Sequence, residues 1–244
     1  MAEIVVKKPV DVRGAVLITG FRGFGMVGYM VSKHVAMALG AEKVGYILTR
    51  ETPPIVLIEE DGAGFPFEIY YSARNKAVIV VNRALPEKEH ADDYARTLAR
   101  WASESGIRAS VLVGGLSRDF MPSGEEHGYR WISNTYYHGP ELEAPQMESG
   151  LGVMGPLALL YIYMDYYKVP SIMVLPYSMV EEVDYNAAVR GVRLVAEKIV
   201  GAKINIEELE AMAHKQKEEL KKVLQLIAEQ GRQQEGEDKG GMYM

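Results

Sequence analysis

The order of apolar runs, glycine turns and helical patterns constrains the fold of this chain more than any other feature. Ala15 to Thr19, Val78 to Val81 and Ser110 to Val113 are short apolar runs that indicate buried strands. Glycines end the first and third runs, and helical patterns at 26–39 and 87–105 follow the first two. Helices that connect strands of one sheet place those strands in parallel. The sequence therefore predicts an α/β fold with three layers, in which helices cover both faces of a mainly parallel sheet.

The rest of the first 200 residues adds elements to this sheet. Further strands are expected at 44–49, 55–59, 67–72, 77–82 and 171–175, and further helices at 152–167 and 184–200. Asp184 is a suitable N-cap for the last of these helices. Between Ser117 and Gly150 the pattern changes to Gly, Pro, Asn and aromatic residues. This change predicts an excursion from the sheet, with one short hairpin near Gly128 to Tyr137.

The C-terminal segment differs in kind from the domain that precedes it. We expect an α/β domain over 1–202, an amphipathic helix over 203–230 that Asn205 caps, and a flexible tail over 231–244. Apolar positions of the helix alternate spacings of three and four, as in the seam of a coiled coil. They are Ile206, Leu209, Ala213, Leu220, Val223 and Ile227, with Gln216 between them. This stripe is expected to contact a neighbouring subunit, and the alternative is that it packs on its own domain.

Composition and charge exclude several classes of protein. With 244 residues, of which 48% are apolar, the chain can bury one large core. The absence of cysteine excludes disulfides, thiolate zinc sites and cysteine nucleophiles. A formal net charge of −6 gives no general attraction to phosphate backbones, so no nucleic-acid partner is expected. The apolar stretch from Leu151 to Met164 is shorter than the ~20 residues of a membrane span, and the N-terminus lacks the pattern of a signal peptide. We expect a cytoplasmic protein without a membrane partner.

Four glycines between the first strand and the first helix form the main candidate for a cofactor site. Gly20, Gly23, Gly25 and Gly28 include the spacing G-x-G-x-x-G, which typically cradles a phosphate after a strand. Two extra residues separate the strand from that spacing, no Lys-Ser/Thr pair follows it, and no acidic residue ends the next strand. The preferred interpretation is a tight turn with close backbone packing, and no cofactor is expected. A nucleotide-binding enzyme that uses this loop is the alternative.

Histidines and acids supply the other candidates for chemistry. They are His34, His90, His127 and His138, with Glu59, Glu60, Asp61, Glu68 and Asp119. None of the established spacings of a zinc protease or a serine hydrolase occurs among them. The acids at 59–61 precede a glycine, as in a solvated turn, and the tyrosines between Tyr161 and Tyr167 are typical of packing. We therefore expect neither a metal site nor a catalytic residue.

The last three residues, Met242, Tyr243 and Met244, are an unusual end for a polar tail. Segment 231–241 is rich in Gly, Gln and charged residues, a composition that forms no packed core. A penultimate tyrosine beside a free carboxylate offers a ring for a pocket, a hydroxyl for a hydrogen bond and a charge for a lysine or for backbone amides. These residues therefore suit a docking tag, although three residues can also occur by chance.

Four segments resemble the archaeal proteasome-assembly-chaperone family, some members of which carry the label of uncharacterised ATP-grasp relatives. The segments are Ala15 to Ile47, Thr52-Pro53-Pro54, Val111 to Asp119 and Gly150 to Tyr177. Together they span most of residues 15–200. The first, AVLITGFRGFGMVGYMVSKHVAMALGAEKVGYI, is the most specific.

The resemblance implies a fold similar to that of purine nucleoside phosphorylases, without a phosphorylase site and without use of ATP. It also implies a homo-oligomer, for which a ring is one arrangement. Some members of the family end in a hydrophobic-Tyr-any tripeptide that inserts into pockets between α-subunits of the proteasome core particle, and Met242, Tyr243 and Met244 match it. The implied function is that of a non-enzymatic chaperone or activator of the proteasome. The alternative is an oligomeric scaffold for another cytosolic protein.

Overall fold

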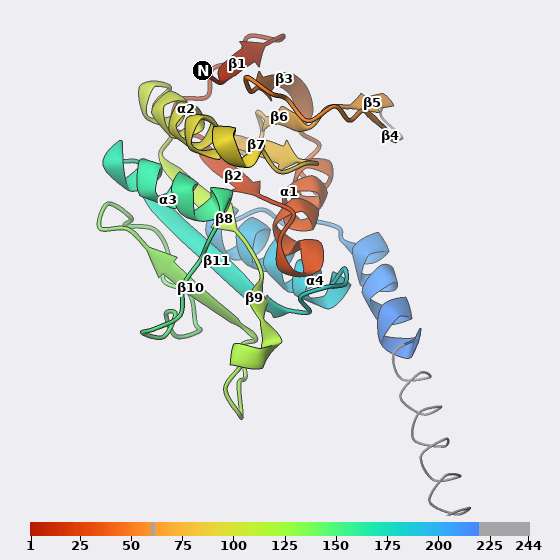
Figure 1. Ribbon diagram of the computed structural model, residues 1–244. Helices are drawn as coiled ribbons and strands as arrows, with labels where there is room; N and C mark the ends of the chain where they lie inside the picture. Colours follow the sequence, from red (N-terminus) through yellow and green to blue (C-terminus); the bar gives the residue numbers. More distant parts are fainter. Residues whose placement is uncertain (60–61, 220–244) are drawn as a thin grey trace, which may run out of the picture.

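A mixed sheet forms the centre of the molecule (Figure 1). The computed structural model describes residues 1–59 and 62–219, and within them the main sheet has nine strands in the order β1-β3-β6-β7-β2-β8-β11-β10, with β9 beside β11. Its parallel core consists of β7 (Ala77–Asn82), β2 (Val16–Gly20), β8 (Ala109–Val113) and β11 (Ser171–Ser178). These strands are almost entirely buried, which agrees with their uninterrupted apolar runs.

The outer strands run antiparallel to this core. β6 (Phe67–Ser72), β3 (Glu42–Leu48) and β1 (Glu3–Val6) extend the sheet beyond β7, and β10 (Tyr129–Ser133) closes it beyond β11. The short strand β9 (Leu116–Ser117) pairs in parallel with the end of β11. The prediction of a mainly parallel sheet is therefore corrected to a mixed one. The physical reason is that β6 returns to β7 through a tight turn rather than through a helix.

Segment 128–137 does not form the predicted hairpin. Tyr129–Ser133 is a single strand, and it pairs along its whole length with residues Ile172–Pro176 of β11. Trp131, within the strand, donates its indole N–H to the carbonyl oxygen of Ala144 (2.7 Å) and so keeps the segment that follows the strand close to the sheet. The excursion therefore supplies an edge strand to the main sheet.

Helices cover both faces of the sheet and give the molecule three layers (Figure 1). One face carries α1 (Val27–Ala38) and α4 (Tyr185–Arg193), which continues as a π-helix over Leu194–Val200; the other carries α2 (Ala91–Glu104) and α3 (Pro156–Tyr166). Short 3-10 turns occupy Phe24–Met26, Lys88–His90 and Arg118–Phe120. Asp184 caps α4, as predicted, because its carboxylate accepts a hydrogen bond from the N–H of Ala187 (3.0 Å).

Alternation along the central strands divides the core between the two faces. In β2, Val16 and Ile18 pack toward α1 and α4, whereas Leu17 packs toward α2 and α3. All three side chains are buried. A slip of one residue would exchange the two sets of side chains between the faces.

A two-stranded hairpin projects from the sheet near β6 (Figure 1). Its strands, β4 (Leu57–Glu59) and β5 (Gly62–Gly64), pair only with each other in the described part of the chain. Arg83 follows β7 and is only 2% exposed. Its guanidinium contacts the carboxylates of Glu59 and Glu68, and it thereby ties the hairpin to the sheet.

The apolar stretch 151–164 is divided between a loop and a helix. α3 begins only at Pro156, after Gly155, whose φ of 81° is favourable for glycine. The helix then packs against α2. Over residues 1–59 and 62–219, no helix has the length and apolar character needed to cross a membrane.

Candidate functional site

The carboxyl ends of the parallel strands β7, β2, β8 and β11 meet at one edge of the sheet, which we call the carboxyl edge. Open α/β sheets bind their ligands at this edge, where the strand order reverses. The chain leaves β2 here and turns into α1 through a double left-handed turn, in which Gly25 has a φ of 60° and Met26 a φ of 52°. Such a conformation is uncommon for methionine. The turn brings the glycine cluster directly onto the carboxyl edge.

Two glycines of this cluster let strand and helix come into backbone contact. A Cβ on Gly20 would lie 2.5 Å from Cα of Gly28, and a Cβ on Gly28 would lie 2.4 Å from the carbonyl oxygen of Val113. In contrast, a Cβ on Gly23 would have no atom within 4 Å. The space next to Gly20 and Gly28 is therefore filled by the chain itself.

Backbone amides at the start of α1 are engaged within the same turn. The N–H of Met26 donates to the carbonyl oxygen of Gly23 (2.9 Å), and the N–H of Tyr29 donates to that of Phe21 (3.2 Å). A phosphate cradle works by presenting such amides to a ligand. Both the amides and the glycines thus give this loop the geometry of a packed turn.

A buried carboxylate organises the turn between β11 and α4 at the same edge. Asp184 is fully buried and accepts hydrogen bonds from the guanidinium of Arg118 (2.7 Å) and the N–H of Met179 (3.0 Å). The neighbouring Ser178 is also fully buried, and its hydroxyl has no hydrogen-bond partner among the described residues. The acid therefore serves local structure, as a cap for α4 and as a partner for Arg118.

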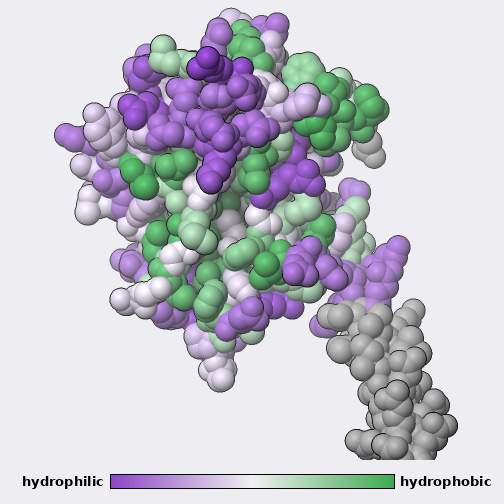
Figure 2. Space-filling model, in the orientation of Figure 1, coloured by the Kyte–Doolittle hydropathy of each residue, from purple (hydrophilic) through white to green (hydrophobic). Residues whose placement is uncertain are grey.

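Large apolar side chains are exposed in the segments that border the carboxyl edge. They either follow one of the parallel strands or precede α3, and 40% to 87% of each residue is exposed: Phe24, Leu85, Phe120, Met121, Met154 and Val180. We call these six residues the apolar edge. Figure 2 shows apolar side chains gathered on this side of the molecule, around β9 and the start of α4. An exposed group of this kind is typical of a surface that contacts another protein.

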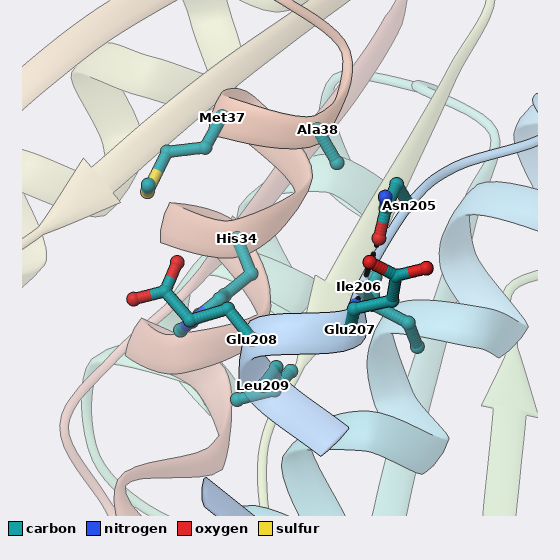
Figure 3. Close-up of a pocket in the computed structure, with 8 residues that line it drawn as sticks. All are labelled: His34, Met37, Ala38, Asn205, Ile206, Glu207, Glu208 and Leu209. Carbon is teal, nitrogen blue, oxygen red and sulfur yellow. Dashed lines mark hydrogen bonds between the residues drawn. The ribbon is translucent and has the colours of Figure 1, made fainter. Parts of the chain in front are cut away.

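A cavity of about 290 Å³ lies away from this edge, between α1 and the segment that leads into the C-terminal helix (Figure 3). Its lining consists of His34, Met37, Ala38, Asn205, Ile206, Glu207, Glu208 and Leu209. Nδ1 of His34 lies 2.8 Å from the carbonyl oxygen of Met30, and burial lowers the pKa of its imidazole. The imidazole is thus fixed to its own helix.

The candidate histidines stand on separate elements. His34 is on α1, His90 precedes α2, and His127 and His138 lie on either side of β10. In the described part of the chain, no three His, Asp or Glu side chains form a group that could hold a metal ion. Asp119 instead lies in the turn after β9, where its N–H donates to the hydroxyl of Ser117 (3.2 Å).

The candidate acids Glu59 and Glu68 belong to the buried network around Arg83. Lys33 of α1 adds a salt bridge to Glu59 (2.7 Å), and Lys43 of β3 adds one to Glu68 (2.8 Å). Burial raises the pKa of Glu59, but hydrogen bonds from Arg83 and Lys33 outweigh burial and bring the pKa to about 2. Sequence analysis missed Arg83, whose one local signal is its position directly after a buried strand.

The first turns of the C-terminal helix pack on their own domain. Residues 207–219 are helical, and Asn205 caps them by accepting the N–H of Glu207 (2.9 Å). Leu209 is fully buried and Ala213 is 5% exposed. Ile206, the third described member of the predicted stripe, packs against the same core. For these three residues the structure therefore shows the alternative that the sequence left open, which is packing within the chain.

The remaining predicted site residues lie outside the described part of the chain. They are Glu60 and Asp61, the helix positions Leu220, Val223 and Ile227, and the C-terminal Met242, Tyr243 and Met244. Contact of the second set with a neighbouring subunit, and docking by the third, stay predictions.

Comparisons with known proteins connect the chain to one family. A model of the PAC2 family matches residues 17–224. An uncharacterised protein of Methanocaldococcus jannaschii is 24% identical over 234 residues, which cover 91% of this chain and 89% of that protein.

Two solved structures from Pyrococcus furiosus share the fold. PbaA, an archaeal homologue of proteasome-assembly chaperone, matches with a TM-score of 0.74 and 18% identity, over 100% of this chain and 99% of PbaA. PbaB, an archaeal proteasome activator, matches with a TM-score of 0.74 and 22% identity, over 91% of this chain and 98% of PbaB.

Proposed function

The chain belongs to the PAC2 family, and from that premise we propose that it is a non-enzymatic assembly chaperone or activator of the proteasome. The observation that carries the proposal is its similarity in fold, along nearly the whole chain, to PbaA and PbaB. The surface features agree with a binding function. The carboxyl edge presents exposed apolar side chains, whereas the amides of Met26 and Tyr29 in its glycine loop are hydrogen-bonded within the loop.

The proposed point of contact is the C-terminal tripeptide, which would dock into pockets between α-subunits of the proteasome core particle. Tyr243 would fill the pocket, Met242 would add apolar contact, and the carboxylate of Met244 would meet a basic group. The support is the match of these three residues to the hydrophobic-Tyr-any pattern found in some members of the family.

The body of the protein would act as an oligomeric carrier of several tails. In this scheme residues 1–202 form the body, 203–230 the helix with subunit contacts at Leu220, Val223 and Ile227, and 231–244 the tail. One tail binds weakly, but several tails on one scaffold raise the effective local concentration. We also propose that the body has a purine nucleoside phosphorylase-like fold. Superposing it on such a structure and comparing the order and direction of the strands would test this.

Co-sedimentation with a purified archaeal core particle tests the docking proposal. The full chain should sediment with the particle, and a chain lacking residues 242–244 should stay in solution. Tyr243→Ala isolates the ring, because it keeps the length and the terminal carboxylate, and it should bind weakly. Peptidase activity, measured in parallel, separates an activator from an assembly factor that leaves activity unchanged. Failure of the full chain to sediment with the particle would refute the proposal.

The apolar edge supports a second candidate, an oligomeric scaffold for a different protein. Such a partner would bind the body and would not need the tail. Binding to a partner that survives deletion of 242–244 but is lost in Phe24→Ser with Phe120→Ser would favour this candidate. Both side chains are exposed, so the two changes should leave the core intact.

A further inference from the structure

The root of the C-terminal helix, residues 205–219, is held by α4 and the loop before it. Leu209 and Ala213 bury their side chains on the domain, and Glu210 forms a salt bridge with Arg193 at the end of α4. Gln216 lies two turns beyond Leu209, and its side-chain amide reaches back to the start of α4. The contacts therefore act at both ends of α4, which defines a direction for the root.

Both halves of the Gln216 amide are used. Its Oε1 accepts a hydrogen bond from the N–H of Tyr185 (3.1 Å), and its Nε2 donates to the carbonyl oxygen of Val183. Tyr185 is the first residue of α4, and the N–H groups at the very start of a helix have no partner inside it. Asp184 satisfies the N–H of Ala187, and Gln216 satisfies that of Tyr185. The root thus supplies part of the cap of α4.

The side of the root that faces α1 is open. The cavity of about 290 Å³ lies there, and Met37 on its rim is 54% exposed. Figure 3 shows the side chains of Met37 and Glu208 on this open side, with Leu209 beneath them. Leu209, Ala213 and the Glu210–Arg193 salt bridge hold the root within one short stretch. Because the cavity leaves space for the root to move there, a contact farther along the helix is needed to fix its angle.

We propose that Gln216 is a positioning residue that fixes the direction in which the C-terminal helix leaves the domain. Its two hydrogen bonds at the start of α4 add a fixed point beyond the contacts of Leu209, Ala213 and Glu210. The consequence for docking rests on the function proposed above. A helix with a set direction aligns the tails of an oligomer with separate pockets, and such preorganisation strengthens multivalent binding without any new contact.

Pulsed electron paramagnetic resonance between two spin labels measures this direction. The full chain has no cysteine, so Arg100→Cys on α2 and Lys217→Cys on the root, both at exposed positions, give one labelled pair. A single narrow distance is expected in this background. Gln216→Ala should broaden it, because the loss of two neutral hydrogen bonds shifts the ratio of held to free roots by about tenfold.

Three variants separate positioning from general stability. Lys215→Ala changes an exposed neighbour on the same helix and should keep the narrow distance. Gln216→Glu keeps the acceptor for Tyr185 but loses the donor to Val183, so it should give an intermediate width. Gln216→Ala should also weaken sedimentation with the core particle, while the loss of its two hydrogen bonds lowers the melting temperature of the domain by only a few degrees.

Two results would overturn the proposal. The first is a distance distribution in Gln216→Ala that equals that of the parent, which refutes the role of Gln216 in setting the direction. The second is unchanged binding to the core particle despite a broadened distribution, which refutes the consequence for docking. If deletion of 242–244 leaves binding intact, the docking proposal fails by itself. The spin-label distances still decide whether Gln216 sets the direction of the helix.

Discussion

Gly28→Ala tests whether the glycine cluster serves packing. A Cβ at this position would lie 2.4 Å from the carbonyl oxygen of Val113 and 2.7 Å from the backbone nitrogen of Phe21. Both neighbours are backbone atoms of the central strand region, so no side chain can rotate away. Helix α1 would have to move off the sheet by about 1 Å to restore ordinary contact. This movement would loosen the packing between α1 and β2.

The expected cost can be estimated from this displacement. Overpacking of a filled core costs about 1–3 kcal/mol, and a clash with backbone on both sides belongs at the upper end. For a chain of this length each kcal/mol lowers the melting temperature by about 2–4 °C. Gly28→Ala should therefore lower it by about 6–12 °C in differential scanning calorimetry.

Gly23→Ala is the matched control within the same motif. Gly23 has a φ of −128°, and an added Cβ would have no atom within 4 Å. Its melting temperature should stay within about 2 °C of the parent, because alanine there also restricts the unfolded chain. Equal melting temperatures for the two variants would refute the packing argument. A nucleotide that stabilises the parent but not Gly23→Ala would instead support a phosphate cradle.

Three further predictions concern the ionic network and the root of the C-terminal helix. Arg83→Met should lower the free energy of unfolding by about 3–5 kcal/mol in urea titrations, since it leaves the fully buried Glu68 without its guanidinium partner; a change below about 1 kcal/mol would contradict this. The pKa of Glu59 in the folded protein is lowered to about 2, below the value of roughly 4.3 in the unfolded chain. The ionised Glu59 therefore stabilises the fold fully above about pH 4.3, and this stabilisation is lost as the pH falls toward 2. Unfolding free energies measured between pH 2 and 6 should therefore fall less steeply in Glu59→Gln than in the parent, and parallel curves would disprove the assignment. Leu209→Ala should weaken the contact of the root with the domain by about 2–5 kcal/mol and speed amide hydrogen exchange over 207–219. Unchanged exchange would show that Leu209 does not anchor the root.

Local signals explain which parts of the fold could be predicted from the sequence. The strands Phe67–Ser72 and Ala77–Asn82 have the predicted bounds, because apolar runs between turn residues mark them. The caps at Asp184 and Asn205 were also predictable, since a capping side chain acts within three residues of its own position. In each case the information lies in a short stretch of chain.

The features that sequence analysis missed depend on contacts between distant segments. The strand Glu3–Val6 lacks a long apolar run, and it is recognisable only through its pairing with β3. The directions of the outer strands follow from how loops return to the sheet. Gln216 appears on the helix as an interruption of an apolar stripe, and only the fold brings it to the start of α4.

The apolar edge was hidden for the same reason, and its composition bears on what the carboxyl edge can bind. Its six residues come from five separate segments, so no window of sequence contains a pattern. A small-molecule site needs a concave pocket with several polar groups that converge on the ligand. Here the loops at the carboxyl edge carry exposed apolar side chains instead. The amides of Met26 and Tyr29 are already hydrogen-bonded within the turn.

Two arginines complete the character of this surface. Arg118 is partly exposed while it binds Asp184, and Arg22 is held at the same edge by the carbonyl oxygen of Arg83 (3.2 Å). Protein interfaces are enriched in arginine and in large apolar side chains, because both contribute contact area once water is excluded. An edge that carries exposed Phe24 and Phe120 together with two fixed guanidinium groups therefore has side chains that are typical of a protein-contact surface. Taken without its surroundings, the G-x-G-x-x-G spacing suggests a phosphate ligand. The reason is that glycine has no Cβ, and the space this leaves can hold either a phosphate or a neighbouring backbone.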